Sequence, residues 1–197
     1  MKTIYYLIRL SRPSNVFIAF CVVPVAVSIT GTFQPLENVI LAAITVALVT
    51  IGANTINDYY DIEIDKINKP DRPLAANKLD PKIAFIYFII VYIAAWLIAL
   101  SINWIMFLIA FIIGLLLYFY SYKLKRTIIW GNLTVSFSSA MAFIYGGFAV
   151  NRLSATIFPA GFAFLFHFGR EIIKDMEDIT GDRGAGSVTF SVKYGTN

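Results

Sequence analysis

The chain has 197 residues, of which 58% are hydrophobic, 16% aromatic and only 14% charged. This composition excludes an ordinary soluble domain and indicates a single integral membrane domain with room for about six spans of roughly 20 residues each. The net charge of +4 does not indicate a nucleic-acid partner, because the basic residues stand between apolar runs rather than on one polar face. We therefore expect an all-α, multi-pass bundle of transmembrane helices.

Six apolar runs follow one another along the chain and are the expected spans. They cover residues 15–30, 39–56, 83–102, 104–120, 128–150 and 153–169. Basic residues precede the first run, as they would precede the core of a signal peptide. However, five more runs follow it and no clear small-residue cleavage site is present, so a membrane span is the better interpretation.

The basic residues gather in alternate connections, which predicts the topology. Fifteen of the sixteen lie in the N-terminal segment, in the connections after the second and fourth runs, or in the tail; the other connections hold only Arg152. Lys and Arg concentrate on the cytoplasmic side of membrane proteins. We therefore expect a cell-membrane protein with both ends of this chain on the cytoplasmic side.

The acidic residues form two clusters with one spacing, after the second run and after the sixth. The segments "DYYDIEID" and "DMEDITGD" place aspartates at steps of three and four, namely Asp58, Asp61, Asp65, Asp175, Asp178 and Asp182. Residues at this spacing share one face of a helix. Each cluster is therefore expected to present three carboxylates in a stripe that continues the end of a span.

Like charges at this spacing repel one another, so the clusters favour a bound cation. Oxygen ligands suit Mg²⁺, which binds through one or two carboxylates, waters and substrate phosphates. We therefore expect Mg²⁺ to link a diphosphate to both stripes. Nearby basic residues are placed to pair with phosphate oxygens, namely Arg72, Lys123, Lys125, Arg126, Arg170 and Lys174. The alternative is a set of solvated loops in which acids and bases neutralise one another.

The two clusters resemble the two signatures of the UbiA superfamily of intramembrane prenyltransferases. They stand here as "NDYYDIEID" and "KDMEDITGD", after the second and sixth runs. The segments "IRLSRPSN", "DRPL" and "YFYSYKLKR" are similar to other parts of the family pattern, and "GREIIKDMEDITGD" is most similar to its ether-lipid branch. The family usually has nine spans. The resemblance therefore implies six spans here of a nine-helix fold, with three further helices encoded beyond residue 197.

The resemblance implies a function and a set of site residues. The function is Mg²⁺-dependent transfer of a prenyl group, geranylgeranyl in the ether-lipid branch, from a prenyl diphosphate donor to a lipophilic acceptor within membrane lipid. In that branch the acceptor would be geranylgeranylglyceryl phosphate; in the quinone, tocopherol and heme branches it would be an aromatic ring. The implied metal ligands are Asn57, Asp58, Asp61, Asp65, Asp175, Asp178 and Asp182. The implied catalytic residues are Asp61, Asp65, Asp178, Asp182 and Lys123.

Aromatic residues near the end of the fourth run are candidates to stabilise an allylic cation through their ring faces. They are Tyr118, Phe119, Tyr120 and Tyr122. Aromatic residues at a membrane boundary also serve as plain interfacial anchors. His167, the only histidine, is interpreted as a structural residue that hydrogen-bonds to a neighbouring helix; the alternative is a catalytic base.

Two other classes of membrane protein fit less well. CDP-alcohol phosphotransferases use membrane aspartates and Mg²⁺, but their Asp-Gly-x-x-Ala-Arg motif is absent from the sequence. Cation transporters place acidic residues near the middle of the bilayer, whereas these acids lie at the ends of the apolar runs.

Overall fold

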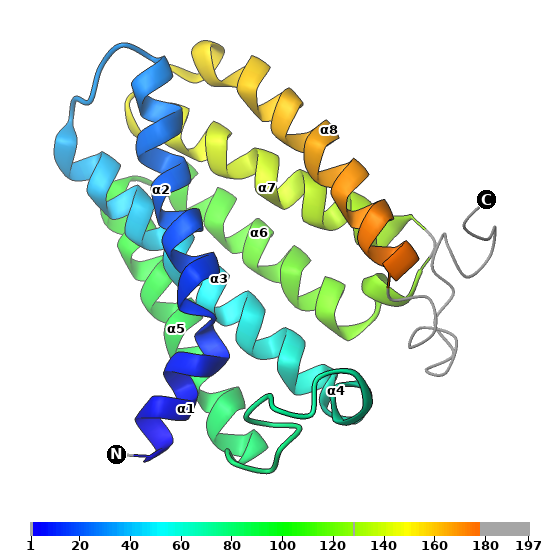
Figure 1. The fold of residues 1–197 in the computed structure, drawn as a ribbon. Helices are drawn as coiled ribbons and strands as arrows, with labels where there is room; N and C mark the ends of the chain where they lie inside the picture. Colours follow the sequence, from blue (N-terminus) through cyan, green and yellow to red (C-terminus); the bar gives the residue numbers. More distant parts are fainter. Residues whose placement is uncertain (1, 128, 178–197) are drawn as a thin grey trace.

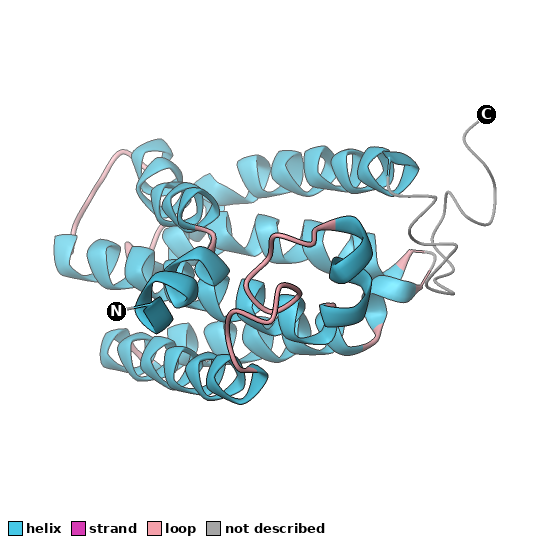
Figure 2. Cartoon of the chain, turned by 60° about the horizontal axis from the view of Figure 1, so that its bottom comes forward, coloured by secondary structure: helices cyan, strands magenta, loops and turns pink. Residues whose placement is uncertain are grey.

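Helices joined by short loops make up the structure, a computed structural model that describes residues 2–127 and 129–177, with only the backbone of Asp175 and Glu177. No strand occurs in this part of the chain (Figure 2). The elements are α1 (Lys2–Ser11), α2 (Pro13–Ile29), α3 (Leu36–Tyr60), α4 (Ile62–Asn68), α5 (Pro81–Ile102), α6 (Trp104–Tyr122), the 3-10 turn η1 (Leu124–Arg126), α7 (Trp130–Ala149) and α8 (Leu153–Glu177). Each of the six apolar runs forms a helix, so the all-α prediction is confirmed.

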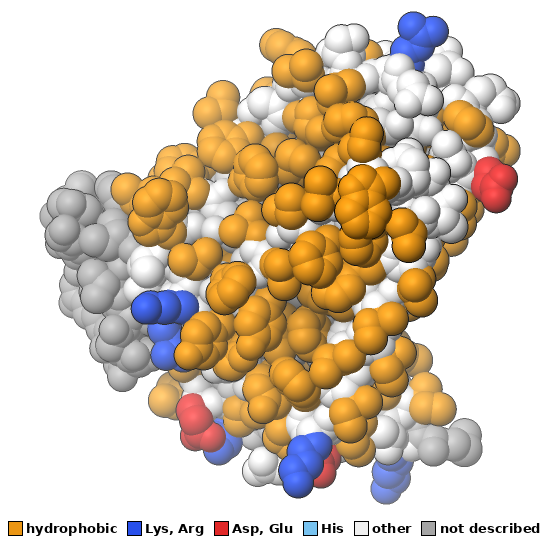
Figure 3. Space-filling view, turned by 180° about the vertical axis from the view of Figure 1, so that it is seen from behind, with side chains coloured by type: hydrophobic (Ala, Val, Ile, Leu, Met, Phe, Trp, Pro, Cys, Tyr) orange, Lys and Arg blue, Asp and Glu red, His pale blue; other side chains and the backbone are white. Residues whose placement is uncertain are grey.

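The long helices run back and forth and leave an apolar belt on the surface. Three of the described helices, α3, α5 and α6, are long and apolar enough to cross a membrane, and α1 with α2, bent by 52°, makes a fourth if the pair is one span. Figure 3 shows the belt on one face, with charged side chains at its two ends. The multi-pass class is confirmed. The count of six spans stays a prediction, because α7 and α8 carry more polar residues.

Local sequence signals set several helix starts. The side chain of Asp80 accepts a hydrogen bond from the backbone of Lys82 (2.8 Å), and Pro81 occupies the first turn of α5. Asn103 caps α6 in the same way, through the backbone N–H of Met106 (2.9 Å). Such caps satisfy backbone donors that have no partner within the helix. Because Asn103 caps α6, this helix can begin directly after the one residue that connects it to α5.

Helix α3 lies at the centre of the bundle and contacts α1, α2, α5, α6 and α7 (Figure 1). On the side toward α5, Gly52 leaves room for the buried ring of Tyr92, since a Cβ at residue 52 would overlap that ring. On the side toward α2 and α7, the core includes small and medium side chains such as Val23, Ala42 and Ala149 together with the ring of Tyr145. Helix α3 is therefore packed on both of these sides.

Candidate functional site

The first acidic cluster lies at a break in the helix. Asp61 separates α3 from α4 with φ −99° and ψ 6°, and Figure 1 shows α4 turning away from the axis of α3. The expectation of one continuous helical stripe is therefore wrong for this cluster. Asp58 and Asp65 instead pair with Arg72, and Asp61 pairs with Lys125, so the ion pairs hold the chain in its broken path.

Asp58 and Asp65 share one guanidinium group. Arg72 donates from Nη1 to Asp58 Oδ1 (2.9 Å) and to Asp65 Oδ2 (2.6 Å), and Arg12 also pairs with Asp58. Both carboxylates are buried, with side chains only 3% and 7% exposed. Burial raises the pKa of Asp65; the hydrogen bond and charge of Arg72 oppose this effect, while the nearby charges of Asp58 and Asp61 add to it. The three acids thus lie close enough to influence one another.

Asp61 pairs with Lys125 of η1, which brings the loop after α6 against the end of α3. The lysine side chain is 11% exposed. Burial lowers the pKa of Lys125, and the carboxylate of Asp61 opposes this effect. Of the predicted phosphate-binding residues in this loop, Lys125 therefore joins the first cluster, whereas Lys123 and Arg126 are exposed.

Arg12 is a site residue that the sequence analysis did not assign. It stands in the bend between α1 and α2 in the left-handed conformation, φ 55° and ψ 73°, which costs roughly 1–2 kcal/mol for a residue other than glycine. This backbone turn directs its side chain to Asp58. The only sequence signal for Arg12 is its place in the segment "IRLSRPSN". Hydrophobic periodicity does not identify it as a site residue.

A basic pocket of about 460 Å³ opens beside these acids. Its lining is rich in Arg and Lys and includes one carboxylate of the cluster. The residues are Arg9, Arg12, Asp58, Asn68, Lys69, Pro70, Asp71, Arg72 and Pro73. The pocket is formed by the α1–α2 bend, the end of α3 and the loop after α4, and its cations suit an anionic group such as a phosphate.

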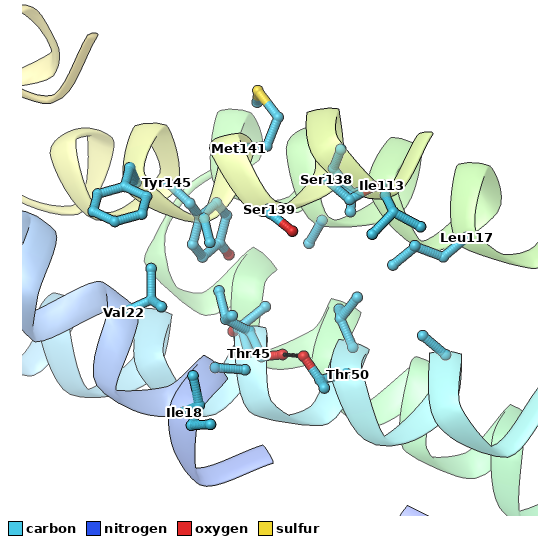
Figure 4. Close-up of a pocket in the computed structure, with 18 of the residues that line it drawn as sticks. Ile18, Val22, Thr45, Thr50, Ile113, Leu117, Ser138, Ser139, Met141 and Tyr145 are labelled. Carbon is cyan, nitrogen blue, oxygen red and sulfur yellow. Dashed lines mark hydrogen bonds between the residues drawn. The ribbon is translucent and has the colours of Figure 1, made fainter. Parts of the chain in front are cut away.

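A second cavity of about 460 Å³ lies among α2, α3, α6, α7 and α8. Its walls are mostly apolar, and Figure 4 shows Ile18, Val22, Ile113 and Leu117 around it, with Thr45 of α3 facing Tyr145 of α7. One end carries polar groups from α2 and α8, namely Asn15, His167 and Arg170. A cavity of this size and lining is suited to a hydrophobic ligand.

The two pockets are neighbours along α2 and α3. Arg12 lines the basic pocket and Asn15, whose backbone N–H donates to the carbonyl of Arg12 (2.9 Å), lines the apolar cavity. On α3, Ala53 lines the apolar cavity and Asp58 the basic pocket. A molecule with a charged head and an apolar tail fits a basic pocket that adjoins an apolar cavity.

The remaining predicted residues fall in several places. Asn57 lies in the last turn of α3 and its side chain is partly buried. Arg170 and Lys174 of α8 donate to the buried carboxylate of Glu171, over 2.8 and 3.3 Å. Glu171 was not predicted, because it lies outside the repeated aspartate spacing of the two motifs. The backbone of Asp175 belongs to α8, whereas Asp178 and Asp182 lie outside the described residues.

The predicted cation-facing tyrosines pack elsewhere in the described structure. Tyr118 exchanges a hydrogen bond of 2.9 Å with Tyr60 and stacks on Phe88, and the ring of Tyr122 lies 5.4 Å from that of Tyr60. Phe119 is exposed and Tyr120 partly buried. Among the described cavity residues, α6 contributes Ile109, Ala110, Ile113 and Leu117 and none of these rings. Their predicted role stays a prediction.

The oxygen-only donor set of the first cluster fits the chemistry of Mg²⁺. Asp58 and Asp65 lie within hydrogen-bond distance of the same nitrogen, and Asp61 is close enough to affect the pKa of Asp65. Within residues 2–127 and 129–177, no group of three or more acidic, His or Cys side chains converges on one point. The metal-ligand assignment of Asn57, Asp58, Asp61 and Asp65 therefore stays a prediction.

Together, these features define an integral membrane protein with a lipid-sized cavity that adjoins a cluster of acids and bases. The chain belongs to the UbiA prenyltransferase family, whose profile matches residues 16–197. This membership confirms the resemblance drawn from the two motifs.

Curated relatives and solved structures support the same family. The chain is 36% identical to the digeranylgeranylglyceryl phosphate synthase of Methanothermobacter thermautotrophicus over 95% of this chain and 66% of that protein. It is 42% identical to the enzyme of the same name from Methanococcus aeolicus, over 84% of this chain and 59% of that protein. A solved structure of a digeranylgeranylglyceryl phosphate synthase has a TM-score of 0.87 and 32% identity, covering 99% of this chain and 70% of that one.

A UbiA homologue from Archaeoglobus fulgidus, solved with GPP and Mg²⁺ bound, has a TM-score of 0.74 at 23% identity and shows the shared fold. The match covers 96% of this chain and 69% of the homologue's chain. The chain thus spans about two thirds of the length of the relatives it matches. The expectation of three further helices stays a prediction.

Proposed function

We propose that this protein transfers a geranylgeranyl group from its diphosphate to the free hydroxyl of geranylgeranylglyceryl phosphate, in ether-lipid synthesis. The observation that carries the proposal is the adjacency of the basic pocket and the apolar cavity along α2 and α3. Relatives named digeranylgeranylglyceryl phosphate synthase, 36% and 42% identical, support the choice of substrates.

In this proposal the basic pocket holds the donor's diphosphate. Arg12 and Arg72, which neutralise Asp58 and Asp65, are the cations beside that group, and Arg9 and Lys69 complete the wall. The prenyl tail lies in the apolar cavity, where each buried methylene contributes about 0.8 kcal/mol. The two pockets thereby bind the two chemically different ends of one molecule.

Mg²⁺ would be held by Asp58, Asp61 and Asp65 together with Asp175, Asp178 and Asp182. When bound, it supplies positive charge that stabilises the departing diphosphate. The Mg²⁺ and GPP bound to the Archaeoglobus fulgidus homologue support the choice of Mg²⁺ and a prenyl diphosphate as ligands. Lys125 orients Asp61 through its ion pair.

In this proposal the reacting carbon lies between the two pockets, near Asn15 and Ala53, which line the apolar cavity. The bond from the allylic carbon to the diphosphate oxygen breaks, and its electron pair leaves with the diphosphate. The acceptor's hydroxyl oxygen then bonds to that carbon and releases its proton. The apolar wall of the cavity keeps water from competing with the acceptor.

The sidedness of the site belongs to the same proposal. The predicted positive-inside topology puts the ends of α3, α6 and α8 on the cytoplasmic side, where a soluble pool of Mg²⁺ is available. The acceptor would reach the cavity from the lipid.

Thermal unfolding of the detergent-purified protein, expressed from its full coding sequence, tests the proposal. Geranylgeranyl diphosphate should raise the melting temperature in the presence of Mg²⁺ and have little effect after EDTA treatment, because the diphosphate binds through the metal. Ligand at 100 times its Kd contributes about 2.7 kcal/mol of stability. Stabilisation by Mg²⁺ alone, with no further gain from the diphosphate, would favour a cation transporter.

A further inference from the structure

Three buried polar atoms in the wall of the apolar cavity lack a hydrogen-bond partner among the described residues. They are Nδ1 of His167 on α8 and, on α7, Oγ of Ser138 and the hydroxyl of Tyr145. All three residues line the cavity, and α7 and α8 pack against each other along their length (Figure 1). The structural interpretation of His167 predicted a hydrogen bond to a neighbouring helix, and none is formed by Nδ1.

An unpaired buried polar group is costly, by about 1–3 kcal/mol. Three such groups on the cavity wall of one packed helix pair are better explained by a polar ligand group than by packing. These atoms lie in a mostly apolar cavity wall, so they are not explained as polar groups of a solvated surface. The wall therefore contains hydrogen-bonding capacity for something that enters the cavity.

The surroundings of His167 indicate the chemistry of that ligand. Arg170 follows three residues later, on the same face of α8, and also lines the cavity. Its side chain is 58% exposed, and a guanidinium group has five N–H donors, of which the hydrogen bond to Glu171 uses one. A hydroxyl group beside a phosphate group would satisfy His167, Ser138 and Arg170 together.

None of these residues lines the basic pocket that is proposed to hold the donor's diphosphate. The basic pocket is built from the α1–α2 bend, α3 and the loop after α4, whereas His167, Ser138 and Arg170 belong to α7 and α8. Asn15 of α2 lines the same cavity one turn after Arg12, so the two sets of residues meet where the donor's first carbon would lie. A nucleophile held by α7 and α8 would therefore face that carbon.

We infer that Ser138, His167 and Arg170 form the acceptor site, which takes a glyceryl phosphate lipid through its free hydroxyl and its phosphate. The inference rests on the proposed function and extends it by naming the residues that select the acceptor. Arg170 then binds the phosphate of the acceptor. Its position near the second motif had indicated the donor's diphosphate instead.

His167 also receives the proton that the reaction releases. The acceptor oxygen forms a bond to the allylic carbon, the bond from that carbon to the diphosphate breaks, and the hydroxyl proton passes to Nδ1 of His167. The products are the ether, the diphosphate and a protonated imidazole, which returns its proton to water. Ser138 holds the hydroxyl in place.

Steady-state kinetics of the membrane protein, expressed from its full coding sequence, tests this site. His167→Leu should lower kcat/KM for geranylgeranylglyceryl phosphate by about 10²-fold or more, the usual contribution of a proton-accepting side chain. His167→Asn keeps a hydrogen-bonding group without a base, so the acceptor KM should recover while kcat stays low. Ser138→Ala should raise the acceptor KM several-fold. Phe166→Leu, an exposed neighbour on α8, is the matched control and should change neither value.

Donor binding provides the second measurement. Thermal stabilisation by geranylgeranyl diphosphate with Mg²⁺ should be the same in wild type and in His167→Leu, whereas stabilisation by the acceptor should be lost in the variant. An unchanged acceptor kcat/KM in His167→Leu, or a loss of donor stabilisation as well, would overturn the acceptor site while leaving the proposed function intact. A wild-type protein that forms no ether product would overturn the proposed function, and this inference with it.

Discussion

Replacing Asp61 with Asn should lower prenyl transfer by about 10²–10³-fold, the usual effect of losing one electrostatic contact to the transition state. The substitution removes one anionic oxygen from the proposed metal site at nearly constant side-chain volume. It also leaves the largely buried Lys125 without its carboxylate partner. Turnover at saturating donor and Mg²⁺, measured by product mass, gives the result.

Glu63→Gln is the matched control for Asp61→Asn. Glu63 lies in α4 two residues after Asp61, but its side chain is 81% exposed and pairs only at the surface with Lys66. The control should retain wild-type turnover. Asp178→Asn, in the second motif, should match Asp61→Asn if both motifs hold one metal cluster. Near-normal turnover of both aspartate variants would contradict the assignment of these acids.

Replacing Arg72 with Gln should destabilise the protein by about 3–5 kcal/mol, the typical cost of breaking a buried ion pair. The buried carboxylate of Asp65 loses its guanidinium partner, whereas Asp58 keeps Arg12. The thermal midpoint in detergent without ligand measures the effect. Donor KM should rise as well, because Arg72 lines the basic pocket.

Two further variants isolate the cause of the Arg72 effect. Lys78→Gln removes an exposed cation from the same loop and should change stability by no more than about 0.5 kcal/mol. The double variant Arg72→Gln with Asp65→Asn should recover much of the lost stability, since it no longer buries an unpaired charge. A single variant Arg72→Gln that melts like Lys78→Gln would show that the bridge contributes little.

The fold could be predicted from the sequence to the extent that hydrophobicity determines it. Each of the six apolar runs forms a helix because a long apolar segment satisfies its backbone only as a helix in lipid. Helices α1 and α4 were not predicted as separate elements, since they are only ten and seven residues long. Their positions depend on tertiary contacts: Arg12 with Asp58 at the start of α2, and Arg72 with Asp65 after α4.

The site was predicted in part, because motif spacing identifies residues without their partners. Repeated spacing selected Asp58, Asp61 and Asp65, and in the structure Asp58 and Asp65 share Arg72 while Asp61 pairs with Lys125. The same spacing suggested an unbroken helix, which is wrong because separate cations bind Asp61 and the other two acids. Single residues such as Arg12 and Glu171 have no repeated pattern. Their roles depend on contacts that become visible only when distant segments pack together.

The most direct test is to follow product formation by mass spectrometry. The protein, expressed from its full coding sequence and reconstituted in liposomes, is given geranylgeranyl diphosphate and Mg²⁺ with either geranylgeranylglyceryl phosphate or 4-hydroxybenzoate. If the proposed function is correct, the product is a glyceryl phosphate carrying two geranylgeranyl ethers. We expect it to form only with Mg²⁺ and to be lost in Asp61→Asn, and we expect no prenylated benzoate. Prenylation of the aromatic acid alone, or no transfer to either acceptor, would contradict the proposed function.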